Sequence, residues 1–303
     1  MTARAPVIAS VARPLIRPLY LAYLGFILAV LYFPFVVMTI LSFQGPRGGH
    51  TFPLRGVSTI WYWKLFNPGK LTPYSDVGEF LGDYLASLQR SVVLAVITML
   101  ISTALALMAA QAFRRGFKGS GLVFYLWLLG IIVPGITVSL GLSLWFRRMD
   151  LPLHWLTTGL PVHVMWTLPF SLIIFLMFFN RFDTSLEDAA LILGATRWKT
   201  FRHVTLPLMQ PAILTSLLFA FTLSLDEFQR SLLITGTDQT LPLMVMASVT
   251  TRITPTLYAL GTLTTLLSFA VVGAYLALLT YSLRKSRRLV EGSGSAVQAR
   301  GSQ

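Results

Sequence analysis

The sequence contains no cysteine and few charged residues. Asp, Glu, Lys and Arg make up 12% of the 303 residues, about half of the roughly 25% typical of soluble domains. Hydrophobic residues make up 55%, and the mean hydropathy is +0.71. The absence of cysteine excludes disulfides and thiolate metal sites, and the four histidines lack ligand spacing, so we expect no metal site. The scarcity of charge predicts a membrane protein.

The sequence also lacks the motifs of several function classes. It has no G-x-x-x-x-G-K-[ST] phosphate-binding loop, so we do not expect it to bind ATP itself. It has no constellation of nucleophile and base, which argues against a membrane-embedded enzyme. Its basic residues are spread over many segments and form no basic face with interleaved aromatics, so we expect contact with anionic lipid headgroups and no nucleic-acid partner.

Long apolar runs predict six membrane-spanning helices, because a helix that crosses a bilayer needs roughly 20 apolar residues. Most of the 24 basic residues lie on the side that holds both termini, which predicts cytoplasmic termini. We therefore expect a cytoplasmic segment 1–18, a six-span domain 19–283 with an outer segment 44–84 and a cytoplasmic loop 181–210, and a basic, disordered tail 284–303. The expected spans are Leu19–Phe43, Leu85–Phe113, Ser120–Phe146, Leu160–Asn180, Pro211–Ile234 and Leu257–Leu283.

The cytoplasmic loop contains the stretch EDAALILGATRWKTFRHVTLPLMQP, from Glu187 to Pro211. A capping box that begins at Ser185 predicts a helix start, and Gly194 suits the left-handed position after a helix end. Thr196 is a suitable cap for a second helix, which Leu206-Pro207 would end. Two such short helices need a packing partner, because isolated helices below about 12–15 residues are marginal in water. The partner is either another protein or the chain's own membrane helices.

The spacing of this loop resembles a known family. The letters DAALILG, nine further residues and VTLP resemble the E-A-A…G…I-x-L-P loop of permease subunits of bacterial ABC importers, with aspartate in place of glutamate and valine in place of isoleucine. Segments such as LSLDEF and GVSTIWYW are similar to the spermidine/putrescine-type permeases. The resemblance implies an all-α, type I permease fold and assigns the ATPase-coupling loop to Glu187, Asp188, Ala189, Ala190, Gly194, Leu206 and Pro207.

The same resemblance implies the partners and the location. The chain would lie in the bacterial inner membrane and pair with a second permease subunit, most simply a different chain. Two ATPase subunits would bind ATP and Mg on the cytoplasmic side, and a periplasmic binding protein would deliver a small cationic or amine-containing solute. No cofactor is expected in this chain.

Asp226 and Glu227 are two acids inside an expected span, where charge is costly and calls for a reason. They either face the substrate pathway or pair with Arg230 along the helix. In polyamine-type permeases an acid commonly follows the proline of span 3, but here the residue is Gly135, which argues for fewer cationic groups on the solute. Gly135 follows Pro134 at an expected helix break and is a second candidate for the pathway.

The outer segment carries Trp61, Tyr62 and Trp63. These aromatics either anchor a short helix at the membrane interface or form a docking surface for the binding protein. A rival function is an ion-coupled secondary transporter that uses Asp226 and Glu227. Such transporters often contain internal repeats, and we find none between the two halves of the sequence.

Overall fold

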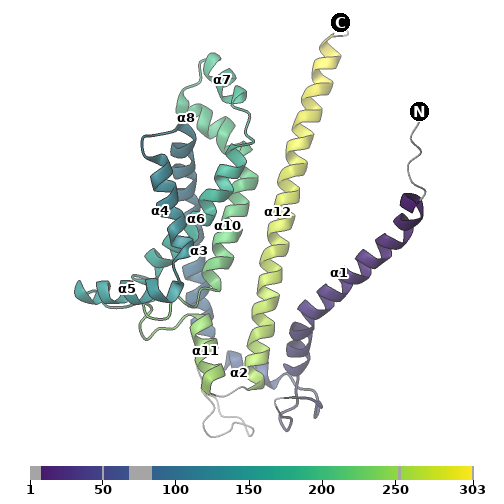
Figure 1. Cartoon of the computed structure of the whole chain (residues 1–303), viewed down its shortest axis with the longest axis vertical. Helices are drawn as coiled ribbons and strands as arrows, with labels where there is room; N and C mark the ends of the chain where they lie inside the picture. Colours follow the sequence, from purple (N-terminus) through teal and green to yellow (C-terminus); the bar gives the residue numbers. More distant parts are fainter. Residues whose placement is uncertain (1–7, 50, 68–83, 252–253, 302–303) are drawn as a thin grey trace. The chain divides into compact units, whose positions relative to one another are not determined.

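The computed structural model describes residues 8–49, 51–67, 84–251 and 254–301, and these are mostly helical (Figure 1). Part of the expected outer segment, residues 68–83, therefore lies outside the described residues. The helices are α1 (Ile8–Leu41), α2 (Ile60–Phe66), α3 (Tyr84–Arg115), α4 (Ser120–Ile132), α5 (Gly135–Arg148), α6 (Gly159–Phe179), α7 (Ser185–Ile192), α8 (Arg197–Thr200), the π-helical turn η1 (Phe201–Thr205), α9 (Leu206–Leu208), α10 (Gln210–Leu225), α11 (Leu241–Thr251) and α12 (Pro255–Gly301).

Four helical segments are long and apolar enough to cross a membrane: Pro18–Leu41, Tyr84–Arg115, Gly159–Phe179 and Pro255–Tyr281. Two bent helix pairs raise the number to six if each pair counts as one span. One pair is α4 with α5, bent by 102°, and the other is the 197–208 stretch with α10, bent by 67°. The all-α expectation is therefore confirmed, with four to six candidate spans among the described residues. The expected third span is bent, whereas the 67° bend at Met209 lies just before the expected fifth span.

The chain falls into two compact units, Met1–Leu81 with Arg252–Thr265, and Gly82–Thr251 with Leu266–Gln303. In the first unit, buried Gln44 organises the loop after α1. Its side chain accepts a hydrogen bond from the backbone N–H of Arg55 at 2.9 Å, and its backbone carbonyl accepts one from the Trp61 indole at 2.6 Å.

In the second unit α3, α6 and α10 pack side by side, and α4 lies against α6 (Figure 1). Small side chains let these helices approach closely, as is usual in membrane helix packing. The Thr103 hydroxyl of α3 also hydrogen-bonds the Ser216 hydroxyl of α10 at 3.0 Å. The core cluster at this contact consists of Ala106, Ala110, Leu172, Phe175, Phe179, Met209 and Ala212.

The expected third span breaks where the sequence predicts a kink. Val133 has extended backbone angles and Pro134 caps α5, because the residue before a proline disfavours helical angles. The expected fifth span, Pro211–Ile234, is also interrupted. Helix α10 ends at Leu225, and residues 226–240 form turns before α11.

Polar side chains from α5, α6 and the loop between them hydrogen-bond this 226–240 segment. Ser139 accepts from the Leu233 N–H at 3.1 Å, and Thr158 donates to the Ile234 carbonyl at 2.6 Å. His163 hydrogen-bonds the Ser231 hydroxyl at 2.9 Å. Non-helical backbone at membrane depth needs such protein partners. Hydropathy does not reveal these partners, so it could not distinguish this segment from a helix.

The tail also differs from expectation. Helix α12 continues through the basic segment to Gly301, where the sequence predicts disorder from residue 284. A helix that is already formed extends at low cost, since nucleation is the unfavourable step.

Candidate functional site

Helix α7 begins at Ser185, as the sequence predicts, but the expected capping box is absent. Thr184 is the N-cap and its side chain makes no capping hydrogen bond. Asp183 instead accepts a hydrogen bond from the Ser185 N–H at 2.9 Å, which satisfies one of the free donors at a helix start. The capping-box prediction is therefore wrong in mechanism, although the helix starts at the predicted residue.

The end of α7 agrees with the sequence prediction. Gly194 has a φ of +85°, and its N–H donates to the Leu191 carbonyl at 3.0 Å. The next N–H, of Ala195, donates to the Ala190 carbonyl at 3.0 Å. This pair of bonds is the Schellman motif, which favours glycine at the left-handed position.

The second short helix also begins as predicted, because the Thr196 side chain accepts a hydrogen bond from the Lys199 N–H. Trp198 stacks on Phe201 with ring centroids 5.7 Å apart. The helical segment does not end at Leu206-Pro207 as predicted, however. It continues through η1 and α9 and bends only at Met209. Proline clashes with the carbonyl four residues earlier, and the wider π turn just before Pro207 relieves that clash.

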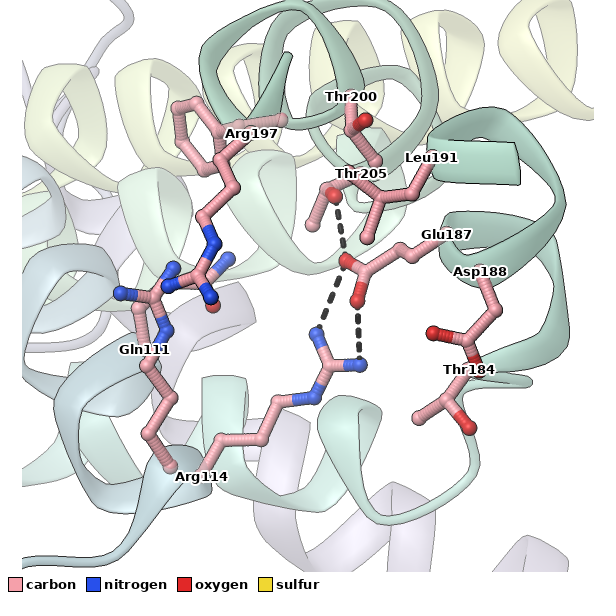
Figure 2. Close-up of a pocket in the computed structure, with 11 residues that line it drawn as sticks. Gln111, Arg114, Thr184, Glu187, Asp188, Leu191, Arg197, Thr200 and Thr205 are labelled. Carbon is pink, nitrogen blue, oxygen red and sulfur yellow. Dashed lines mark hydrogen bonds and ion pairs between the residues drawn. The ribbon is translucent and has the colours of Figure 1, made fainter. Parts of the chain in front are cut away.

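One carboxylate connects this α7–α9 segment (residues 185–208) to the membrane helices. Glu187 forms two hydrogen bonds with the Arg114 guanidinium at the end of α3, at 3.0 and 2.7 Å (Figure 2). Thr205, in η1, donates a third hydrogen bond to the same carboxylate at 2.5 Å. Arg114 in turn lies over the rings of Phe179 and Phe182, 5.2 and 5.0 Å from their centroids. Bidentate charged pairs of this kind are strong and directional.

Glu187 is one wall of a cavity of about 500 Å³ between the end of α3 and the α7–α9 segment. Asp188 and Thr184 lie on its α7 side, and Arg115 and Arg197 add positive charge to its lining (Figure 2). Burial by itself would raise the pKa of Glu187. The hydrogen bonds from Arg114 and Thr205 and the charges of Arg114 and Arg115 outweigh burial and hold this pKa below its usual value of 4.5.

The outer side of the α7–α9 segment is apolar and exposed. Ile192 and Leu193 are each 86% exposed, and Trp198 is 66% exposed. Ala189 is also exposed, and a Cβ built on Gly194 would meet no atom within 4 Å. Two small residues of the expected coupling loop, Ala189 and Gly194, are thus exposed in this segment, while Ala190 is partly buried.

The two membrane acids have different surroundings. Glu227 is buried and forms an ion pair with Arg230 at 3.2 Å, and it also accepts a hydrogen bond from the Arg230 backbone N–H at 2.8 Å. The Arg230 guanidinium lies 3.5 Å from the centroid of the Trp166 ring. Asp226 is the C-cap of α10 and forms no ion pair within the described residues. Arg230 therefore neutralises Glu227 and not Asp226.

Gly135 lies against this charged cluster. A Cβ at Gly135 would lie 2.9 Å from the Gln229 side-chain oxygen and 3.0 Å from an Arg230 guanidinium nitrogen. The structure thus brings Gly135 and Glu227 to the same cluster, through Arg230. The role of Gly135, Asp226 and Glu227 in a pathway stays a prediction.

The aromatic residues of α2 are only partly available for docking. Trp61 is buried and donates to Gln44, and the Tyr62 hydroxyl hydrogen-bonds Ser42 at 2.6 Å. Trp63 is the exposed member of the three. Docking of a binding protein at Trp61, Tyr62 and Trp63 stays a prediction. Its candidate surface is the side of α2 that carries Trp63. Over the described residues no group of three His, Asp or Glu side chains could hold a metal ion.

The roles of Arg114 and Thr205 were not predicted from the sequence, in which Arg114 is only one of the basic residues that set orientation. The only available signal was an arginine at the very end of an apolar run, next to a loop with an acidic helix start. That signal does not identify the partner, which is 73 residues away.

Comparisons with known proteins agree with the resemblance. Residues 102–288 match the model of a family described as binding-protein-dependent transport system inner membrane component. The spermidine/putrescine transport system permease protein PotC of Haemophilus influenzae is 29% identical over 253 residues, which cover 83% of this chain and 92% of the relative. The putrescine transport system permease protein PotI of Escherichia coli is 30% identical over 247 residues, or 79% and 82% of the two chains.

A solved structure shares the fold. It belongs to a bacterial ABC transporter involved in the import of the acidic polysaccharide alginate, and the match has a TM-score of 0.56. The match covers 94% of this chain and 99% of the other, with 15% sequence identity.

Proposed function

We propose, from the premise that this chain belongs to the family of binding-protein-dependent transport system inner membrane components, that its α7–α9 segment is the docking element for a cytoplasmic ATPase subunit. The chain is a multi-pass membrane permease of the ABC importer type. The observation that carries the proposal is the exposed apolar face of two short helices, Ile192, Leu193 and Trp198 included, held at one end of the α3–α6–α10 bundle.

The rest of the assembly follows from this docking role. A second permease subunit, most simply a different chain, would line the pathway with this one, and two ATPase subunits would bind ATP and Mg. A binding protein would deliver the solute on the outer face, and both termini would lie in the cytoplasm. ATP binding would bring the ATPases together, move the α7–α9 segments and reorient the spans, so that this chain needs no cofactor and performs no covalent chemistry.

The docking role is tested by adding bulk to the exposed face. Ala189→Trp should abolish co-purification with a purified ATPase subunit of the same transport system, because the new side chain would project from an exposed position of α7. Membrane insertion and thermal stability of the variant should stay unchanged. Arg181→Ala, at another exposed position before α7, is the control and should co-purify normally. Full ATP-driven uptake by Ala189→Trp would contradict the docking role.

We further propose a small solute with an amine or another cationic group. Two relatives are named for the transport of spermidine and putrescine or of putrescine, and in this chain Asp226 is the membrane acid that Arg230 does not neutralise. Neutralisation of Glu227 by Arg230 leaves Asp226 as the carboxylate of this pair that could meet a solute cation, which suits a solute of low positive charge.

Asp226→Asn should raise the KM for putrescine uptake in proteoliposomes by at least about fivefold, the lower end of typical coupling energies between linked groups. The matched variant Asp238→Asn, an acid on the turn segment that pairs with Arg90 at 3.1 Å, should leave KM within about twofold. An unchanged KM in Asp226→Asn would remove Asp226 from the pathway. Uptake under an ion gradient without ATP would instead favour the secondary-transporter alternative.

A further inference from the structure

The attachment of α7 to the rest of the chain depends on few contacts. The helix has eight residues, and its apolar residues Leu186, Leu191 and Ile192 are exposed. A helix this short has little stability of its own. Something other than apolar burial must therefore fix its position relative to the membrane helices.

The Arg114–Glu187 pair supplies that connection. Glu187 is in the first turn of α7 and Arg114 is in the last turn of α3. Thr205 of η1 donates a hydrogen bond to the same carboxylate. Arg114 also stacks on Phe179, at the end of α6, and on Phe182 just after it. This ion pair thus connects the end of α3 to three elements from a later part of the chain, α6, α7 and η1. Figure 2 shows the Glu187 carboxylate between Arg114 and Thr205.

The geometry of the pair fixes orientation as well as distance. A single hydrogen bond allows its two partners to rotate about it, whereas two parallel bonds between a guanidinium and a carboxylate hold both planes together. The two bonds here are 3.0 and 2.7 Å long, and both side chains are about four-fifths buried. Side chains of this burial are screened less by water and salt than exposed pairs.

We propose that Arg114 and Glu187 are positioning residues that make α7 and α3 move as one body. The inference rests on the proposed function, in which α7 receives the movement of an ATPase. A displacement of α7 would then reach α3 through this pair, and α6 and α10 through their packing on α3. Without the pair, ATPase subunits would still dock on the exposed face, but their movement would be taken up by the loop around residues 180–184.

The first experiment measures the attachment itself and needs no partner. The chain has no cysteine, so spin labels can be placed at Ile192→Cys on α7 and Met108→Cys on α3, both exposed positions. In the unaltered background we expect a narrow distance distribution in detergent micelles. Glu187→Gln and Arg114→Lys should both broaden it, since the lysine keeps the charge but lacks the guanidinium fork. Lys118→Gln, which removes a charge just after α3, should leave it narrow.

The second experiment measures coupling in the full complex in proteoliposomes, with putrescine as the probe. Glu187→Gln should retain the ATPase subunits and their hydrolysis rate, while putrescine uptake per ATP falls by at least about fivefold. The exchanged pair Arg114→Glu with Glu187→Arg should recover part of the loss, which a merely destabilised loop would not do. Lys118→Gln again serves as the control.

The outcomes separate the two proposals. A distance distribution that stays narrow in Glu187→Gln, or unchanged uptake per ATP, would overturn the positioning role. Loss of the ATPase subunits from Glu187→Gln would also overturn it and would make Glu187 part of the docking face. Failure of the unaltered chain to bind an ATPase subunit would contradict the proposed function, while the spin-label result would still decide whether α7 and α3 are joined.

Discussion

Among the described residues, two arginine–glutamate pairs have the arginine over aromatic rings, and the two pairs have different roles. Arg114 and Glu187 are 73 residues apart and join α3 to α7, with side chains 18% and 20% exposed. Glu227 and Arg230 are three residues apart in one turn, with side chains 7% and 6% exposed. The first pair connects elements of the fold, and the second neutralises charge within a single buried segment.

The difference in burial predicts a difference in energy. Removing one partner of a buried pair leaves an uncompensated charge at a cost of about 3–5 kcal/mol. The cost is smaller where water reaches the remaining charge more easily, as at the Arg114–Glu187 pair. We therefore expect the Glu227–Arg230 pair to matter more for stability, and the Arg114–Glu187 pair to matter more for the relative movement of the helices.

The largest expected effect comes from Arg230→Ala. This variant leaves Glu227 buried without its charged partner and removes the cation from the Trp166 ring. We expect a loss of about 3–5 kcal/mol of stability, and a smaller loss for Arg114→Ala, because Glu187 is more exposed than Glu227 and keeps its hydrogen bond from Thr205. Unfolding of the two purified variants in detergent micelles, followed by circular dichroism, measures the difference.

A double variant provides the control for this prediction. Arg230→Met combined with Glu227→Leu removes both charges of the buried pair, so neither is left uncompensated, and the double variant should be more stable than Arg230→Ala alone. Equal destabilisation by Arg230→Ala and Arg114→Ala would show that burial does not separate the two pairs.

The second prediction concerns the glycine that packs against the buried pair. Gly135→Ala places a Cβ 2.9 Å from the Gln229 side-chain oxygen and 3.0 Å from an Arg230 nitrogen. Arg230 cannot move away freely, because it is bound to Glu227 and stacked on Trp166. We expect a loss of about 1–3 kcal/mol, as is usual for overpacked sites, measured by the same unfolding transition.

Gly141→Ala is the matched variant on the same helix. A Cβ at Gly141 would meet nothing within 4 Å, so only the helix propensity changes, and alanine should stabilise α5 by about 0.5–1 kcal/mol. If both substitutions shifted stability in the same direction, contact with the Arg230 cluster would not be what requires glycine at position 135.

Local features of the fold were predictable from the sequence. The start of α7, the left-handed Gly194 and the cap at Thr196 depend on residues within a few positions of each other, and hydropathy located the apolar spans. The break at Pro134 was expected for the same reason, since the backbone restriction imposed by proline is local.

The features that the sequence did not predict depend on distant partners. The end of α10 at Leu225 requires side chains such as Ser139, Thr158 and His163 to satisfy the turn segment that follows, and apolar composition carries no sign of them. The role of Arg114 depends likewise on Glu187 and Thr205, 73 and 91 residues further along the chain. The loop motif predicts the coupling residues, but it does not show what holds the loop in place.

The smallest expected effect is the pH dependence of the Arg114–Glu187 pair. The pKa of Glu187 in the folded chain lies below its usual value of 4.5, because hydrogen bonds and nearby arginines outweigh burial. A carboxylate with a lowered pKa contributes stability that is present above its unfolded pKa and is lost as the pH falls through its folded pKa. The stability difference between the unaltered chain and Glu187→Gln should therefore be constant from about pH 5.5 to pH 8 and shrink below about pH 4.5.

Unfolding of the two chains measured side by side across this pH range tests the prediction, and only the difference between them is informative, since other acids titrate in both. Asp183 also has a lowered pKa, caused by hydrogen bonds from Ser185, so Asp183→Asn is a useful third curve with a loss at similar pH. If the Glu187→Gln difference instead disappeared between pH 6 and pH 8, burial would dominate at Glu187. The carboxylate would then be protonated where the transporter works, and the joint between α7 and α3 would lack the charge on which its two parallel hydrogen bonds depend.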